Sequence, residues 1–252
     1  MSNRKRSKAL KQNLKILLLQ IRNDPQVCQE EIESFARYSG LENSQIEVLN
    51  VFRTEVKNNR VDSYDALYVG GSSDVSVLEP EKYPFVLPCQ KLLRYCAEIK
   101  KPVFASCFGF QLAVMAFAGQ ILRDKSGYEM GTIPINLTEL AVSDPVFKNT
   151  NDNFLAVSVH QEKALEIPDC FELLAYTDKC CHAFKHKQSP FWACQFHPEV
   201  DLDILIQRLG VYRHKYTDGD GHYEALLDGF KATPESNALL KQFVDNVLLS
   251  YA

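Results

Sequence analysis

One short stretch of the sequence joins a strand-like apolar run to a helix-like run through a single cysteine. In Val103–Val114, VFASCFGFQLAV, Cys107 stands between the two runs. A residue on such a tight turn projects its side chain above the sheet. The helix that follows would direct the positive end of its dipole at the sulfur, which favours the thiolate. The amide of Phe108 could then donate to an oxyanion. The stretch fits a cysteine nucleophile, and it fits a packed core cysteine equally well.

A second stretch supplies the groups that a nucleophilic thiol needs, namely a base and a group that orients the base. In Phe191–Val200, FWACQFHPEV, an apolar strand ends at His197 and Glu199 follows two residues later. In an extended chain such residues point to the same side. The carboxylate could therefore bind one imidazole nitrogen while the other faces the thiol. A lone histidine at a strand end is more often structural, but the two stretches together indicate a triad of Cys107, His197 and Glu199.

The elements around these residues alternate between strand and helix. The patterns predict strands at Leu14–Gln20, Gln45–Phe52, Tyr64–Ser76 and 102–106, and helices at Asp24–Gly40, Pro84–Lys101 and 108–119. Asp24 suits an N-cap and Gly40 a helix end. Short connections between alternating elements predict an α/β fold, with an open, mostly parallel sheet covered by helices on both faces.

The remaining sequence changes character twice. Five strand patterns lie at 131–140, 153–159, 171–177, 181–186 and 191–196. Helical patterns follow at 201–216 and from Thr233 onward, separated by a glycine-rich turn at 217–222. We expect residues 1–13 to form a basic flexible tail, 14–200 the main domain, and 201–252 a helical extension packed on that domain.

Composition narrows the class of protein further. A net charge of −4 gives no general reason to expect nucleic acid or an anionic membrane as partner. We expect a cytoplasmic protein, since no apolar run approaches the roughly 18 residues of a membrane span.

The eight cysteines show no CxxC pair and are expected to be free thiols. The cluster Cys180, Cys181, His182 and His186 has poor spacing for one tetrahedral ion. We therefore expect no metal and no cofactor.

Two motifs resemble the signatures of one enzyme family. Ser106–Gln111, SCFGFQ, and Gln195–Glu199, QFHPE, resemble the two signatures of class I, or triad-type, glutamine amidotransferases. The likeness covers roughly residues 14 to 200 and lies nearest to the glutaminase domain of guanosine-monophosphate synthase and its stand-alone relatives. It implies a flavodoxin-like fold.

The resemblance also implies roles for individual residues. Cys107 would attack the carboxamide carbon of glutamine, His197 would take the thiol proton and later protonate the leaving ammonia, and Glu199 would hold the imidazole tautomer. Water would then hydrolyse the γ-glutamyl thioester. The backbone amides of Phe108 and Gly71 would hold the oxyanion.

Two further residues match substrate-pocket positions of the family. Gln111 matches a position that lines the glutamine pocket, although it could also cap its own helical turn. His160 matches a histidine near the substrate, although a structural histidine is nearly as good an interpretation.

The sequence departs from the family pattern at three places. Ala105 replaces a glycine before the cysteine, Ser72 replaces a proline of the oxyanion loop, and Gln161–Glu162 replace Gly-Asp after His160. The last change leaves open whether the substrate is free glutamine or another γ-glutamyl compound.

Three functions therefore stay open. The first is a glutaminase that supplies ammonia, with the acceptor on a separate synthetase subunit because no phosphate-cradling motif occurs in the sequence. The second is a γ-glutamyl peptidase or hydrolase. The third is a non-catalytic regulatory module, which the intact triad disfavours. A homodimer formed through residues 201–252 is a further possibility, although simple packing is the preferred interpretation of that segment.

Overall fold

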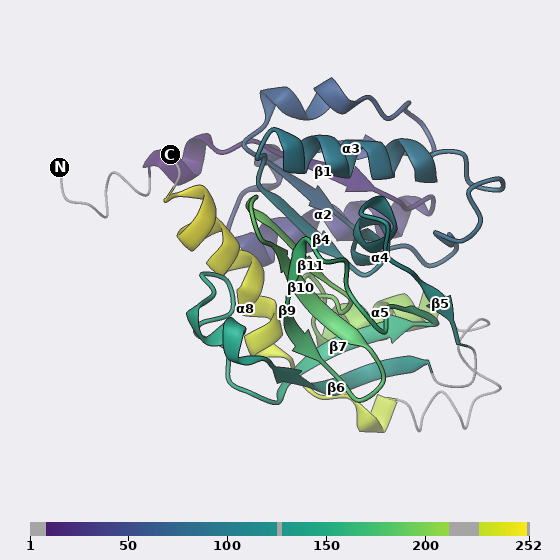
Figure 1. Cartoon of the computed structure of the whole chain (residues 1–252), viewed down its shortest axis with the longest axis vertical. Coiled ribbons are helices and arrows are strands. Elements are labelled where there is room, and N and C mark those ends of the chain that lie inside the picture. Colours follow the sequence, from purple (N-terminus) through teal and green to yellow (C-terminus); the bar gives the residue numbers. More distant parts are fainter. Residues whose placement is uncertain (1–8, 125–127, 212–226, 251–252) are drawn as a thin grey trace.

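A computed structural model describes residues 9–124, 128–211 and 227–250 of the chain (Figure 1). Its centre is a nine-stranded sheet with the strand order β2-β1-β3-β4-β11-β10-β9-β6-β7. The first five strands in this order run parallel, and the remaining pairs are antiparallel. The predicted α/β class with a mostly parallel sheet is confirmed for the half that carries Cys107, while the other half is an antiparallel addition.

The parallel strands are short and largely buried on both faces. They are β2 (Ile46–Asn50), β1 (Ile16–Gln20), β3 (Ala66–Val69), β4 (Val103–Ser106) and β11 (Phe191–Cys194). Continuous apolar runs such as ILLLQ and VFAS are typical of strands covered by helices on both sides. All four residues of β3, β4 and β11 are buried.

Helices cover the two faces of the parallel half. The helix α3 (Val86–Glu98) and the helix α4 (Phe108–Ala116) share one hydrophobic cluster with one face, and α2 (Pro25–Ser39) shares another cluster with the opposite face. Asp24 caps α2 by accepting hydrogen bonds from two amides of its first turn, and Gly40 ends it in the left-handed conformation. Both predicted ends of this helix are thereby confirmed.

The antiparallel half extends the sheet beyond β11. Its strands are β10 (Cys181–His186), β9 (Phe171–Tyr176), β6 (Glu129–Leu137) and β7 (Phe154–His160). A separate two-stranded ribbon pairs β5 (Leu122–Arg123) with β8 (Glu162–Lys163). Three short 3-10 helices span Asn43–Gln45, Asn58–Ser63 and Glu139–Ser143.

The C-terminal segment lies along the sheet. It contains α5 (Leu202–Val211), α8 (Pro234–Phe243) and a π-helical turn at Val244–Leu248. Figure 1 shows α8 in yellow beside the strands of the sheet. Phe243 of α8 contacts the rings of Tyr68 and Phe104, so this helix completes the core on the face that α2 covers. The glycine-rich turn expected at 217–222 lies outside the described residues.

Residues 1–13 are expected to form a flexible tail, but the part of this segment that the structure describes is ordered. Residues 9–13 form a short helix. The Gln45 side chain donates to the carbonyls of Lys11 and Leu14 at 2.8 and 2.9 Å, and Lys11 forms an ion pair with Asp245. These contacts hold the start of the described chain against the domain. Within the described ranges, no helix is both long enough and apolar enough to cross a lipid bilayer.

Candidate active site

Cys107 stands on a strained turn at the carboxyl end of β4. Its backbone has φ 49° and ψ −101°, an unusual conformation for a non-glycine residue, and α4 starts at the next residue. The turn is tight: a β-carbon on Gly109 would lie 2.9 Å from Val69 Cγ1 and 3.0 Å from Ala105 Cβ. Glycine is therefore required at 109, and the small Ala105 fits where the family has glycine.

His197 follows β11, the strand beside β4. The strand ends at Cys194, three residues earlier than expected, and the chain then turns. The backbone N–H of His197 donates to the carbonyl of Val157 at 2.8 Å, which fixes the position of the turn. His197 Nδ1 lies 2.6 Å from Glu199 Oε1. The expected pairing of the imidazole with the carboxylate is present, but a turn produces it and not the extended chain that the sequence pattern suggests.

The sulfur and the imidazole meet above the ends of β4 and β11. The Cys107 sulfur lies 3.9 Å from the carbonyl oxygen of Val159 and 3.9 Å from Nε2 of Gln195, and Cys107 is near enough to His197 to raise the pKa of the imidazole. Both residues are close to the same backbone: a β-carbon on Gly71 would lie 2.7 Å from His197 Cε1 and 3.5 Å from Cys107 Cβ. Sulfur, imidazole and carboxylate therefore form a continuous row at the carboxyl ends of neighbouring parallel strands, where α/β sheets place their ligand sites.

The charges of the row shift its acid–base equilibria. Burial alone would lower the pKa of His197, but the charges of Cys107 and Glu199, together with the hydrogen bond to Glu199, raise it to about 9. Burial alone would raise the pKa of Glu199, but the facing imidazolium lowers it to about 2. A charged imidazole thus stabilises the carboxylate, and the carboxylate stabilises the charged imidazole.

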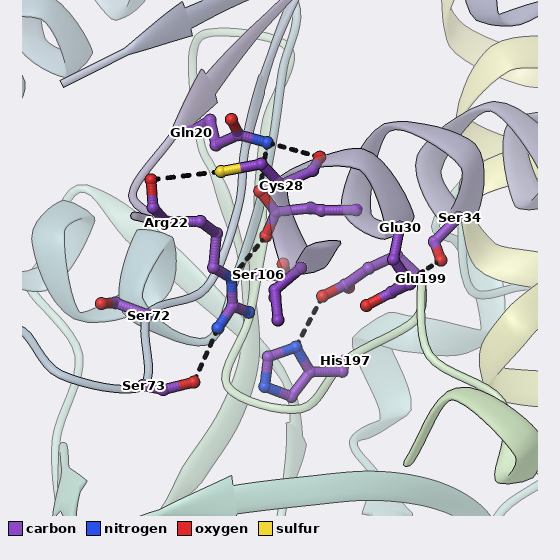
Figure 2. A network of polar contacts seen from close by, with 12 residues as sticks. Gln20, Arg22, Cys28, Glu30, Ser34, Ser72, Ser73, Ser106, His197 and Glu199 are labelled. Atoms are coloured by element: carbon purple, nitrogen blue, oxygen red, sulfur yellow. Dashed lines mark hydrogen bonds and ion pairs between the residues drawn. The ribbon is translucent and has the colours of Figure 1, made fainter. Parts of the chain in front are cut away.

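A buried ion pair supports the loop beside the row. Arg22, just after β1, lies 3.0 Å from Glu31 through its Nε and donates from Nη1 to Ser73 Oγ at 2.9 Å (Figure 2). Both charged side chains are almost fully buried. A β-carbon on Gly70 would lie 2.6 Å from Glu31 Oε1. The pair therefore lies against the Gly70–Gly71 loop that the resemblance assigns to the oxyanion.

A cavity of about 410 Å³ opens beside the sulfur. This volume is near the lower end of the roughly 300–1,000 Å³ typical of small-molecule sites. Cys107, Gln111 and His160 are among its lining residues. Charged side chains of both signs complete the wall: Asp74, Glu79, Lys82, Arg123 and Glu162. The cavity suits a small polar ligand that carries charges of both signs.

The two substrate-pocket residues proposed from the resemblance have additional contacts. Gln111 does not cap its own helix; its Nε2 donates to the carbonyl of Glu162 at 2.9 Å and so connects α4 with β8. His160 Nε2 lies 3.0 Å from Glu129 Oε2. Burial lowers the pKa of His160, while the hydrogen bond with Glu129 opposes this shift. Both residues therefore line the cavity and also connect separate elements.

The cluster of Cys180, Cys181, His182 and His186 is split by the fold. Cys180 Sγ and His182 Nε2 lie 3.4 Å apart. Cys181 turns the other way, with its sulfur 3.2 Å from the carbonyl of Leu165. His186 accepts hydrogen bonds through Nδ1 from two backbone amides. The four residues do not form one site together.

The fold and the row of side chains define a class of protein: an α/β protein with a cysteine displayed on a strand-to-helix turn and a histidine–glutamate pair in the turn that follows the adjacent strand. A model of the glutamine amidotransferase class-I family matches residues 33–205. The chain belongs to this family, as its two signature motifs indicate.

Relatives of known name match a shorter part of the chain. A GMP synthase subunit of the glutamine-hydrolysing kind from Methanococcus vannielii is 39% identical over 102 residues, which is 40% of this chain and 52% of that protein. The protein of the same name from Pyrococcus furiosus is 32% identical over 114 residues, covering 44% of this chain and 58% of that one. The chain thus spans about half the length of the relatives it matches.

Solved structures match almost the whole chain. A glutamine amidotransferase from Thermotoga maritima superimposes with a TM-score of 0.75 at 18% identity, over 93% of this chain and 98% of that one. A glutamine amidotransferase from Methylobacillus flagellatus gives a TM-score of 0.66 at 15% identity, over 93% and 92%. At these identities the likeness establishes the fold, which confirms the predicted fold class.

The sequence does not identify the charged side chains that lie next to the row of Cys107, His197 and Glu199 or in the cavity wall. The motifs do not point to Arg22 and Glu31, nor to Arg123, which contacts Glu162 in the cavity wall. Arg22 does carry a signal, because it is a charged residue directly after a buried strand. Its partner cannot be found in this way, since Glu31 is one of three glutamates in a helix that looks amphipathic.

Proposed function

We propose that the chain hydrolyses a γ-glutamyl amide through Cys107, His197 and Glu199. The observation that carries the proposal is the convergence of Cys107 with the His197–Glu199 pair, remote from it in sequence: the imidazole is hydrogen-bonded with the carboxylate, both Cys107 and His197 lie against Gly71, and Cys107 borders a polar cavity. A row of nucleophile, base and orienting group is the arrangement that nucleophilic catalysis requires.

The chemistry follows from the order of the three groups. His197 takes the thiol proton before the attack, in keeping with the raised pKa of this imidazole, and the sulfur of Cys107 then attacks the carboxamide carbon. The carbonyl oxygen becomes an oxyanion next to the amides of Phe108, the first residue of α4, and Gly71. The C–N bond then breaks as the imidazolium gives its proton to the leaving nitrogen. Water, with one proton passed to the imidazole, cleaves the γ-glutamyl thioester and restores the thiol.

The charged wall of the cavity supports an amino-acid head group as the recognised part of the substrate. A γ-glutamyl compound carries an α-carboxylate and an α-ammonium group away from its reacting amide. Arg123 and Lys82 are cations of the cavity wall that could bind the first, and Glu79 and Asp74 are anions that could bind the second. Glu79 forms ion pairs with Arg123 and Lys82, so substrate binding would replace part of these contacts. Free glutamine is the smallest compound with these features.

A second candidate is a hydrolase of larger γ-glutamyl conjugates, and one observation favours it. The residues that replace the family's Gly-Asp, Gln161 and Glu162, both line the cavity. The Glu162 carboxylate receives hydrogen bonds from Ser76 at 2.5 Å and from Arg123 Nε at 3.0 Å. The departure from the family pattern therefore alters the wall that substrate would contact.

The name of the matched archaeal relatives is that of one subunit of a glutamine-hydrolysing GMP synthase. For this chain we propose, by analogy, that the ammonia passes to a separate synthetase subunit. This part of the proposal predicts that glutamine hydrolysis rises when that synthetase, together with its own substrates, is added.

One assay tests the proposal. Purified protein is incubated with glutamine, and separately with γ-glutamyl peptides, while ammonia and free amine are measured. The variant Cys107→Ala should lose the activity by roughly 10⁴-fold or more. Cys194→Ala is the matched control, because Cys194 is also buried but lies within β11. Release that persists in Cys107→Ala would remove the nucleophile, release from peptides alone would favour the second candidate, and no release from either would favour a non-catalytic module.

A further inference from the structure

Four buried side chains converge in the antiparallel half of the sheet. They are Glu129 of β6, His160 of β7, Cys180 in the turn before β10, and His182 of β10. One potential ligand atom from each lies within 4.8 Å of the other three. We propose that these four residues bind one zinc ion. Neither the family match nor the matched relatives' names refer to such a site, and the sequence pattern alone predicts none.

The hydrogen-bonding groups of the cluster do not satisfy one another without a cation. His182 Nε2, His160 Nε2 and Cys180 Sγ lie 2.8, 3.0 and 3.5 Å from the same oxygen, Glu129 Oε2. Three donors on one carboxylate oxygen exceed its two lone pairs.

The spacing of the four atoms is near that of a tetrahedral zinc site. Zinc-to-ligand distances of about 2.0–2.3 Å place neighbouring ligand atoms about 3.3–3.8 Å apart. The sulfur of Cys180 already lies 3.5 Å from Glu129 Oε2 and 3.4 Å from His182 Nε2. The two imidazole-to-carboxylate separations, 2.8 and 3.0 Å, must widen by about 0.3–0.5 Å. The two remaining separations, from His160 Nε2 to His182 Nε2 and to Cys180 Sγ, lie within 4.8 Å and must narrow where they exceed the tetrahedral range.

The sheet holds these ligands on a rigid frame. Glu129 and His160 are directly opposite each other in the β6–β7 pair. Cys180 Sγ and His182 Nε2 lie 3.4 Å apart and so face the same point, while the sulfur of Cys181 between them faces the carbonyl of Leu165. The second carboxylate oxygen, Glu129 Oε1, accepts a hydrogen bond from Thr177 at 3.0 Å. Such support of a ligand is typical of metal sites.

The ligand set selects the class of ion and its role. One thiolate, two imidazoles and one carboxylate oxygen suit zinc, whereas calcium and magnesium prefer oxygen ligands throughout. The thiolate and the carboxylate together neutralise a divalent charge. Four protein ligands leave no open position, so the ion would be structural. It would tie β6, β7 and the start of β10 together beside His160, which lines the cavity next to Cys107.

The test measures metal binding and does not depend on catalysis. The full chain is produced with zinc in the medium and purified without chelator, and its metal content is determined. The background variant Cys107→Ser prevents the triad thiol from contributing. We expect about one zinc per chain. After chelation and addition of Co²⁺, we expect a thiolate-to-cobalt charge-transfer band together with the visible bands of tetrahedral cobalt.

Matched variants locate the ion. Cys180→Ser should abolish the charge-transfer band, while Cys181→Ser, which changes the adjacent thiol that faces Leu165, should leave it intact. Chelator should also lower the midpoint of thermal unfolding in the background protein and have no effect on Cys180→Ser. A folded background protein without zinc and without the cobalt band would overturn the proposal, as would a band of full strength in Cys180→Ser. Because only metal content, spectra and unfolding are read, failure here would leave the proposed amide hydrolysis untouched.

Discussion

The variant Gly71→Ala tests the packing of the Gly70–Gly71 loop against the row of Cys107, His197 and Glu199 to which we assign catalysis. The added β-carbon would lie 2.7 Å from His197 Cε1 and 3.0 Å from Arg22 Nη2, whereas ordinary contact begins at 3.4 Å. The shortfall is 3.4 − 2.7 = 0.7 Å against the imidazole and 3.4 − 3.0 = 0.4 Å against the guanidinium. Gly71 has no positive φ, so alanine adds no backbone strain and the effect is purely one of contact.

Neither neighbour can move without cost to the reaction. The imidazole is held by its 2.6 Å contact with Glu199, and the guanidinium is held by Glu31 and Ser73. Either the imidazole ring of His197 shifts by about 0.7 Å relative to the sulfur, or the loop moves away from the ring and the Gly71 amide is displaced together with the loop. A misplacement of about 1 Å costs on the order of 10²-fold in rate, so we expect kcat to fall by about 10–10²-fold with a much smaller change in KM.

The assay is initial-rate release of ammonia or amine from whichever γ-glutamyl substrate the unmodified protein cleaves. Gly229→Ala is the matched control, because nothing lies within 4 Å of a β-carbon at that position. Thermal unfolding of both variants separates a local effect from a loss of fold. If Gly71→Ala folds normally and retains the full kcat, the loop does not pack against the working imidazole, and the assigned geometry is wrong.

Three further substitutions give distinct expected results. Glu199→Gln should lower kcat/KM by about 10²–10⁴-fold and move the alkaline limb of its pH profile to lower pH. The charged imidazole of His197 persists below its raised pKa of about 9 and is lost above it, and the Glu199 carboxylate is one of the groups that raise this pKa. An alkaline limb at an unchanged pH in Glu199→Gln would show that the carboxylate does not raise the pKa of the imidazole. Gly109→Ala should destabilise the fold by about 1–3 kcal/mol in urea unfolding, because its β-carbon has no space on the turn, so wild-type stability would show that the turn can relax. Glu31→Ala should lower the free energy of unfolding by about 3–5 kcal/mol, because the buried charge of Arg22 loses the Glu31 carboxylate. A loss below about 1 kcal/mol would mean that water or another group takes the place of that carboxylate.

The parallel half of the fold could be predicted because its signals are local. Continuous apolar runs identify buried strands, and Asp24 and Gly40 mark the two ends of α2. Cys107 could be placed on its turn for the same reason, since strand, cysteine and helix are adjacent in sequence.

The remaining features depend on contacts between distant residues, which a single sequence does not reveal. The strand patterns after residue 130 can be recognised, but not their antiparallel order, because period-two alternation carries no information on direction. The approach of His197 to Glu199 is expected from an extended chain and arises in a turn held by Val157. The Cys180–His182 pair gains Glu129 and His160 only because β9 pairs with both β10 and β6, which brings β6 and β7 near the start of β10.

The most direct test of the central claim is covalent capture with an electrophilic glutamine analogue, such as a diazoketone, followed by peptide mass mapping. The geometry predicts a single adduct, on Cys107, which excess substrate prevents and which His197→Ala greatly slows. The other thiols serve as internal controls within the same experiment. Labelling spread over several cysteines, or labelling of Cys107 at an undiminished rate in His197→Ala, would contradict the claim that this imidazole activates this sulfur.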